Sequence, residues 1–545
     1  MDYYDLGTYR RPITTASADA QLWFDRGLLW TYAYNHEEAI ACFRRALDHD
    51  PQCAMSHWGI AYAVGPNYNK PWEAFEPEEK PAALAIARDA VAAASDLALN
   101  SEPAERALIK AIRARYPQSG DVEDFGPFND AYANEMRLVH GSFPGDPDLS
   151  ALFAEAVMNR TPWQLWDLQT GAPAEGADTA EAIRVLEQAF STIEGAWQHV
   201  GLLHIYIHLM EMSPHPERAL RHGDRLATLA PDAGHLIHMP THIDVLCGEY
   251  ENVVSRNQKA MEADKTYLER EGADNFYTLY RCHNFHFKIY GAMFLGQAKT
   301  ALQAADALID NLPESVVRPR ADWFEGFVPM KQHVLVRFGL WDDILAQPMP
   351  DDRTLFSVTT AMMHYARAVA LSNTDQIRAA ENERDQFFAA RDQVPESRML
   401  FNNTCLDILA VAEEMLLGEL EYRKGNHKAA FRHLRKSVEI DDALPYDEPW
   451  GWMQPTRHAL GALLLEQGQL EEAETVYRAD LGLDATLARA CQHPGNVWSL
   501  HGLHECLSRR DETVELLHIK QQLDKAMARA EVPIHASCYC RRSAA

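Results

Sequence analysis

The chain has 545 residues, and 51 lysines and arginines stand against 79 aspartates and glutamates, which gives a formal net charge of −28. This balance excludes the basic footprint of a nucleic-acid-binding protein and the basic patch that binds an anionic membrane surface. Hydrophobic residues make up 47% of the sequence and charged residues 24%, so wholesale disorder is excluded as well.

The sequence also lacks the usual signals for export or membrane insertion. No apolar run approaches the roughly 18 residues of a transmembrane helix. The first five residues show no basic region followed by an apolar one, as a secretory signal would. Nine cysteines, mostly isolated, do not form a disulfide framework. We therefore expect a soluble protein of the reducing cytoplasm.

The first predicted element is a repeat between residues 20 and 53. Small, aromatic and proline residues recur in it at spacings of 3, 9, 4 and 8: Gly27, Trp30, Ala39, Phe43 and Pro51. The segment resembles a tetratricopeptide repeat, a unit of about 34 residues. The resemblance implies two antiparallel helices that cross closely at small residues. Pro51 would end the second helix, because proline cannot continue it.

The same resemblance recurs along the chain, on these residues: Ala219 and Pro231; Gly248 to Tyr250; Gly296, Ala301 and Pro313; Gly418, Gly425 and Ala430; Gly461, Gly468, Ala473 and Tyr477; Trp498, Gly502 and Val514. Three stretches rich in proline and glycine, at 65–81, 159–179 and 346–356, are predicted to be loops inserted between helices. Strand signals are nearly absent. The predicted fold is all-α, a tetratricopeptide-like α-solenoid in which helix-turn-helix repeats form a right-handed superhelix.

We expect the repeats to form one continuous domain over 1–545. Within it the sequence predicts N-terminal repeats with an inserted loop at 20–115, histidine-rich central repeats at 181–313, C-terminal repeats at 325–530 and a tail at 531–545.

Histidines are concentrated in the central repeats. Ten of the 24 lie between His199 and His286, where uniform scattering would place about four. When three successive repeats are aligned on the repeat pattern, seven histidines occupy position 2, 5 or 9 in the first helix of a repeat. They are His204, His208, His235, His238, His242, His283 and His286. Spacings of three and four residues put side chains on one helical face. The resemblance implies that this face lines the concave groove.

A metal site is the interpretation that we favour for these seven histidines. Neighbouring packed helices lie about 8–10 Å apart, so imidazoles from two helices can share one ion. The rival interpretation, an acidic peptide held by protonated histidines, requires several charged imidazoles side by side, and these repel one another. Pro240 is predicted to kink the helix over 235–247, which could turn His242 elsewhere.

The donor set indicates the type of metal. Imidazole nitrogen suits copper, iron or zinc, whereas magnesium and calcium prefer oxygen. Seven histidines exceed the three or four that one ion needs, so two ions bind, or some histidines act as acids, bases or orienting groups. A coupled dicopper site would suit the activation of dioxygen. Alternatively, His204, His208 and Glu211 would form the two-histidine, one-carboxylate face of nonhaem iron. We favour copper or iron slightly over zinc.

Two further residues on the same stripe are candidate catalytic groups. Glu211 would act as a general base or hold a histidine in place. Tyr290 would donate a hydrogen bond to a substrate. Their alternative roles are ordinary solvation and packing.

Two segments outside the central repeats are further candidates for a role at the site or groove. Cys538 and Cys540, with His535, would bind a soft metal or cap the groove, unless the tail is simply mobile. Residues Asn67 to Asn69 either line one mouth of the groove or form a turn.

The function expected from this pattern is a metal-dependent oxidoreductase that uses copper or nonhaem iron on a small-molecule metabolite. The alternatives are a tetratricopeptide scaffold that binds a protein or peptide partner, and a zinc-dependent hydrolase or lyase. Motifs for nucleotide binding, serine hydrolysis and the zinc protease signature are missing from the sequence.

Overall fold

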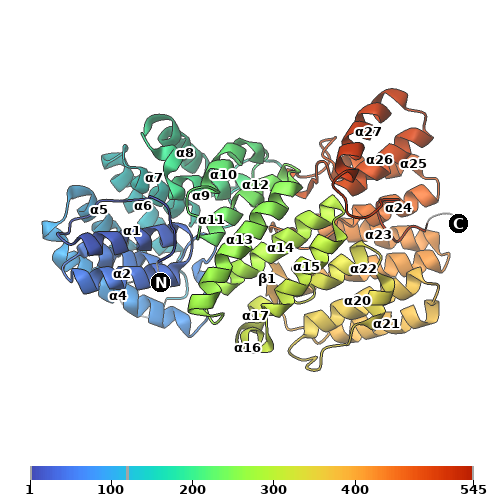
Figure 1. Ribbon diagram of the computed structural model, residues 1–545, viewed down its shortest axis with the longest axis horizontal. Helices are drawn as coiled ribbons and strands as arrows, with labels where there is room; N and C mark the ends of the chain where they lie inside the picture. The colour runs from blue at the N-terminus through green and yellow to red at the C-terminus, as the bar shows by residue number, and fades with distance from the viewer. Residues whose placement is uncertain (1–2, 118–121, 543–545) are drawn as a thin grey trace. The chain divides into compact units, whose positions relative to one another are not determined.

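The computed structural model describes residues 3–117 and 122–542, and it is mostly helical (Figure 1). The chain folds as two compact units. Unit 1 consists of Met1–Ile243 and Lys259–Tyr277, and unit 2 of Asp244–Gln258 and Thr278–Ala545. Among the described residues, no helix is long and apolar enough to cross a membrane. The predicted division of the sequence into repeat blocks stays a prediction.

Unit 1 begins with a helical hairpin and continues through further helices in chain order. The helices are α1 (Ala18–Tyr32), α2 (His36–His49), α3 (Ala54–Ala63), α4 (Glu79–Leu97), α5 (Pro103–Ile112), α6 (Gly126–Ser142), α7 (Pro147–Met158), α8 (Thr179–Thr192), α9 (Val200–Glu211), α10 (Leu220–Leu226) and α11 (Gly234–His238). Two helices, α12 (Pro240–Leu246) and α13 (Tyr250–Glu271), contribute residues to both units.

Unit 2 contains the remaining helices and a two-residue antiparallel strand pair. The elements are α14 (Thr278–Leu295), α15 (Ala298–Asp310), α16 (Glu314–Val317), α17 (Ala321–Phe324), α18 (Met330–Arg337), α19 (Trp341–Ala346), α20 (Ser357–Asn373), α21 (Ile377–Arg391), β1 (Met399–Leu400), β2 (Asn403–Thr404), α22 (Cys405–Arg423), α23 (His427–Asp442), α24 (Arg457–Glu466), α25 (Leu470–Asp480), α26 (Val497–Arg509) and α27 (Thr513–Met527). Sequential helices pair as hairpins, as in α20 with α21 and α22 with α23.

Large side chains fill the spaces that glycines leave at the helix crossings. Phe43 of α2 is fully buried between α1 and α3. A Cβ atom added at Gly27 would lie 2.6 Å from the Phe43 ring, and one at Gly59 would lie 2.7 Å from it. Tyr477 in unit 2 meets Gly461 and Gly502 in the same way, at 2.5 and 2.1 Å. The all-α, tetratricopeptide-like fold class is therefore confirmed.

The helical hairpins share a turn geometry. One of the first two residues after the first helix has a positive φ angle, which is the left-handed position that commonly ends a helix. Five hairpins place glycine there and two place aspartate: Gly248, Gly296, Gly339, Gly425, Gly468, Asp375 and Asp511. The first hairpin places Tyr34 there, with φ 55°. A bulky residue in this region is uncommon because its side chain crowds the backbone.

The predicted inserted loops are also confirmed. They lie between α3 and α4, between α7 and α8, and between α19 and α20. The first contains a single short 3₁₀ turn at Trp72–Ala74.

Replacing Phe43 by alanine tests the role of the large residue at the glycine crossing. We expect Phe43→Ala to lower the free energy of unfolding by about 3–5 kcal/mol, because the cavity that it leaves is walled by two helices. Leu22→Ala is the control, since Leu22 on α1 is 45% exposed. Urea denaturation followed by tryptophan fluorescence measures both, and equal losses in the two variants would contradict this packing account.

Candidate metal centre

Five of the seven predicted ligands lie in unit 1. His204 and His208 are on α9, His235 and His238 are on α11, and His242 is on α12. All five side chains are buried, with at most 2% of the residue exposed. Buried polar side chains normally have a specific partner, so the contacts of these rings indicate what they do.

Helix α9 lies directly against α1 because Gly201 has no side chain. A Cβ atom at this position would lie 2.6 Å from the ring of Tyr32. Asp148 of α7 reinforces the contact, since its Oδ1 accepts hydrogen bonds from the Tyr32 hydroxyl at 2.6 Å and from His199 Nε2 at 2.9 Å. Burial alone would raise the pKa of Asp148, but its contacts with His199 and Arg11 hold that pKa well below its usual value.

The close approach of α9 to α1 determines where the protons of its two histidines lie. His204 Nδ1 is 2.6 Å from the carbonyl oxygen of Tyr32, and His208 Nδ1 is 3.0 Å from Oε1 of Glu211. Both oxygens can only accept, so each Nδ1 donates its proton. The Nε2 atoms of these neutral rings therefore carry lone pairs. Both are buried and have no hydrogen-bond partner in the part of the chain that the structure describes.

His235 completes a group of three with these histidines. One ring nitrogen from each of His204, His208 and His235 lies within 4.8 Å of the other two. Nitrogens bound at about 2.1 Å to a single ion lie roughly 3–4 Å apart, so small side-chain movements would suffice to bind one. Burial lowers the pKa of all three imidazoles well below the usual value, which keeps them in the neutral form that binds metals.

Glu211 holds two imidazoles with one carboxylate. Its Oε1 accepts from His208 Nδ1, and its Oε2 accepts from His242 Nδ1 at 2.8 Å. The carboxylate thereby directs Nε2 of both rings away from itself. Carboxylates that bind the outer nitrogen of a metal-ligating histidine play this role. The contacts favour the orienting role of Glu211 over the role of a direct ligand.

His238 and His242 form a second close pair. Their Nε2 atoms are 2.9 Å apart, a separation that fits either a hydrogen bond donated by His238 or two ligands of one ion. Pro240 does interrupt the helix, because α11 ends at His238 and α12 begins at Pro240. The Thr241 hydroxyl donates to the carbonyl of His238 at 2.7 Å. The interruption does not turn His242 away from His238, and the two rings remain neighbours as residues four apart on a helix are.

An aromatic wall surrounds the group of three. The ring of Tyr34 lies 4.6 Å from that of His204 and 5.7 Å from those of His208 and His235. The ring of Tyr68, in the predicted mouth segment, lies 5.1 Å from the rings of both His208 and Trp163 and is tilted to each. The segment is also a turn, because Asn67 Oδ1 accepts from the backbone N–H groups of Asn69 and Lys70.

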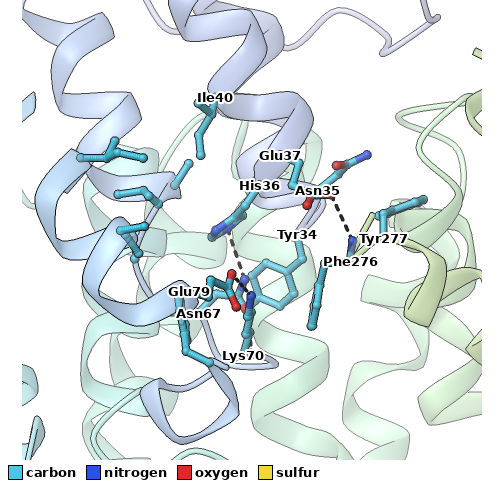
Figure 2. A pocket seen from close by; sticks show the side chains of 17 residues that line it. Tyr34, Asn35, His36, Glu37, Ile40, Asn67, Lys70, Glu79, Phe276 and Tyr277 are labelled. Atoms are coloured by element: carbon cyan, nitrogen blue, oxygen red, sulfur yellow. Dashed lines mark hydrogen bonds and ion pairs between the residues drawn. The ribbon is translucent and has the colours of Figure 1, made fainter. Parts of the chain in front are cut away.

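Tyr34 also lines a pocket of about 230 Å³ in unit 1, which Figure 2 shows from close by. Its apolar wall includes Ile40, Phe75 and Phe276. Its polar wall includes Lys70, whose Nζ lies 4.3 Å from the centres of both phenylalanine rings and pairs with Glu79. Tyr34 thus belongs both to the pocket and to the surroundings of the histidines.

The other predicted site residues lie on α14 in unit 2. His283 contacts the rings of Phe287 and Phe401, and His286 Nε2 is 2.8 Å from Sδ of Met453. The Tyr290 hydroxyl is 3.1 Å from His493 Nε2. The participation of these three residues in one centre with the unit 1 histidines stays a prediction.

Sequence reasoning missed Tyr34, although a signal was present. It stands at the hairpin position where the other hairpins have glycine or aspartate, and that substitution is visible once the repeats are aligned. The contact of His204 with the Tyr32 carbonyl could not have been found in this way, because it depends on how closely two distant helices approach.

Comparison with known protein families supports the first predicted repeat. Residues 20–53 match the family model of the tetratricopeptide repeat. No curated protein matches the chain. Solved structures similar to it include a Cut9–Hcn1 hetero-tetramer of the APC/C (12% identity, covering 93% of this chain and 76% of that one, TM-score 0.31). They also include a human IFIT1 dimer with m7Gppp-AAAA (10% identity, covering 95% of this chain and 92% of that one, TM-score 0.32). Another is yeast Tom70 (12% identity, covering 92% of each chain, TM-score 0.28). The chain therefore contains a tetratricopeptide repeat at residues 20–53, within an all-α fold of helical hairpins.

Proposed function

We propose that the protein is a metal-dependent oxidoreductase whose centre is the histidine group of unit 1, with copper or nonhaem iron acting on a small-molecule metabolite. The observation that carries the proposal is the state of His204 and His208. Each has its Nδ1 proton bound by an oxygen and its Nε2 lone pair buried without a partner. This is the arrangement of a histidine prepared for a metal ion.

A purely structural role accounts poorly for these two rings. A buried polar atom without a partner costs about 1–3 kcal/mol, and two of them lie on successive turns of one helix. A leucine at either position would fill the same space without this penalty. An ion bound to the Nε2 atoms would remove the penalty and would use the neutral form that burial favours.

The five buried histidines of unit 1 can be divided between two positions. His204, His208 and His235 would hold one ion, and the His238–His242 pair would contribute to a second or would supply a proton donor. A redox-active metal at such a site supplies one-electron chemistry, whereas zinc would support hydrolysis or elimination. Glu211 would hold the rings of His208 and His242 in fixed orientations during the reaction.

The pocket in Figure 2 is our candidate for the substrate site. Tyr34 lines it and also contacts the His204 ring, and the Lys70–Glu79 ion pair lies among its apolar walls. A small molecule with an apolar body would suit these walls. The cytoplasmic location expected from the composition is part of this proposal.

A partner-binding scaffold is the second candidate function. The tetratricopeptide match and the helical-hairpin fold fit such a role without any chemistry. A scaffold would not need a stoichiometric metal, so metal content separates the two functions.

Elemental analysis of protein purified without chelator tests the centre. We expect stoichiometric copper or iron in the native protein and its loss from the double variant His204→Ala/His238→Ala. His215→Ala is the control, because the His215 side chain is 65% exposed. Circular dichroism verifies that each variant is folded. Native protein without stoichiometric metal would favour the scaffold, and stoichiometric zinc without a visible absorption band would favour the hydrolase or lyase.

Neutralising Glu211 tests its orienting role. Glu211→Gln retains the size of the side chain but presents an N–H group to one of the two imidazole N–H groups. We expect metal affinity to fall by about 10–100-fold, as on removal of other orienting carboxylates. Competition with a chromophoric chelator measures the change, with Glu217→Gln on the exposed turn as the control. Unchanged affinity would rule out the orienting role.

Removing the Tyr34 ring tests the wall between the pocket and the histidines. Glycine is well suited to the φ angle of this position, so Tyr34→Gly should fold. We expect a chelator to remove the metal faster from Tyr34→Gly than from the native protein, and Tyr34→Phe, which keeps the ring, to behave like the native protein. Stopped-flow absorbance measures the rates, and equal rates in all three proteins would contradict the assignment.

A further inference from the structure

Residues 531–542 of the predicted tail are packed against unit 2 rather than mobile. Ile534, Ser537 and Cys540 are at most 3% exposed. The Ser537 hydroxyl donates to the carbonyl of His458 at 2.8 Å, and Arg337 donates to the carbonyl of Ser537. The sulfur atoms in this segment therefore have defined surroundings.

Cys538 and Cys540 are joined by a disulfide bond, while the other seven cysteines are not in disulfides. A bond between residues two positions apart closes a very small loop, so it removes little entropy from the unfolded chain. It is therefore a poor structural crosslink. Cys538 is half-buried and Cys540 is buried, so an incoming thiol can reach only one of the two sulfurs readily.

A buried carboxyl group stands beside this pair. Glu419 of α22 is 3% exposed, and one of its oxygens lies within 4.8 Å of both sulfurs. The Asn373 side chain donates to Glu419 Oε2 at 3.0 Å and accepts from Arg423, which also donates to the carbonyl of Cys540. Burial raises the pKa of Glu419 to about 7, so at neutral pH it can both donate and accept a proton.

We propose that Cys538 and Cys540 form a thiol–disulfide exchange site in which the buried Glu419 carboxyl exchanges protons with the sulfur atoms. The site takes a dithiol as its reductant, and it is independent of the proposed metal centre. Thiol–disulfide exchange is a chemistry distinct from that proposed for the histidines of unit 1.

The exchange balances with a dithiol as the co-reactant. A thiolate of the dithiol attacks the accessible Cys538 sulfur, the Cys538–Cys540 bond breaks, and a mixed disulfide forms. Cys540 leaves as a thiolate and takes a proton from Glu419. The second thiol of the reductant then attacks the reductant's own sulfur in the mixed disulfide, and its proton restores the Glu419 carboxyl group. Cys538 leaves as a thiolate and takes from solvent the proton that the first thiol released on forming its thiolate. Two electrons and two protons pass from the dithiol to the protein disulfide.

Native redox titration of the full chain with reduced and oxidised dithiothreitol tests the proposal. After alkylation with N-ethylmaleimide, mass spectrometry of the C-terminal peptide reports both sulfurs. We expect Cys538 and Cys540 to change together from the disulfide to two alkylated thiols while the protein stays folded. A pair that is not reduced under native conditions would overturn the proposal. So would a reduced pair that holds zinc and resists alkylation.

The rate of reduction tests the part played by Glu419. At pH 7 we expect Glu419→Gln to slow reduction by about 10²-fold, as the loss of a positioned proton donor does. Glu414→Gln on the same helix is the matched control. The charged or titratable groups facing Glu419 are Arg423, Tyr365 and the two cysteines. Because the neutral carboxyl is the donor, the ratio of native to variant rates should fall as the pH rises through 7. A ratio that does not change with pH would contradict the proton transfer.

Single-cysteine variants provide a second measurement should Glu419→Gln fail to fold. In Cys540→Ser the remaining Cys538 should react with a disulfide reagent at least about tenfold faster than Cys540 does in Cys538→Ser, because thiol reactivity follows access. The opposite order would overturn the assignment of Cys538 as the attacked sulfur.

Discussion

The close contact between α1 and α9 is the constraint on which the histidine group depends. Gly201 allows the ring of Tyr32 to lie against the backbone of α9, and Asp148 holds both helices through Tyr32 and His199. Only at this separation does His204 Nδ1 reach the Tyr32 carbonyl. A side chain at residue 201 would push the helices apart, and His204 would lose the partner that directs its other nitrogen.

The five candidate ligand histidines of unit 1 are buried, whereas helical repeats usually offer an exposed groove to their partners. In an ordinary hairpin repeat the first helix contributes its inner face to a surface for partners. Helices α9, α11 and α12 carry imidazoles that are at most 2% exposed, and burial lowers the pKa of His204, His208 and His235 well below the usual value. Tyr34 adds a bulky ring at a turn where other hairpins have glycine or aspartate. Both features work against stability, which is common where a fold serves a chemical site.

The two proposed sites differ in their chemistry and in the unit that holds them. The histidine group uses nitrogen ligands on helices of unit 1, whereas the cysteine pair lies on the packed tail of unit 2. In both, a buried carboxylate stands next to the reactive atoms: Glu211 holds two imidazole protons, and Glu419 lies beside two sulfurs. Burial makes such carboxylates effective because water does not compete for their contacts.

Repeat spacing and helical periodicity were enough to predict the helical hairpins and to place His204 and His208 on one helix face. Repeat spacing is local, so Gly27, Phe43 and Pro51 could be assigned to one hairpin, and a period of 3.6 residues put His204 and His208 on one face. The packing of the helices set which partners these side chains meet: Glu211 contacts His242 as well as His208, Tyr34 lies against His204, and the tail residues are buried. Each of these depends on the distance between segments remote in sequence, and that distance follows from the packing of many side chains rather than from any local pattern.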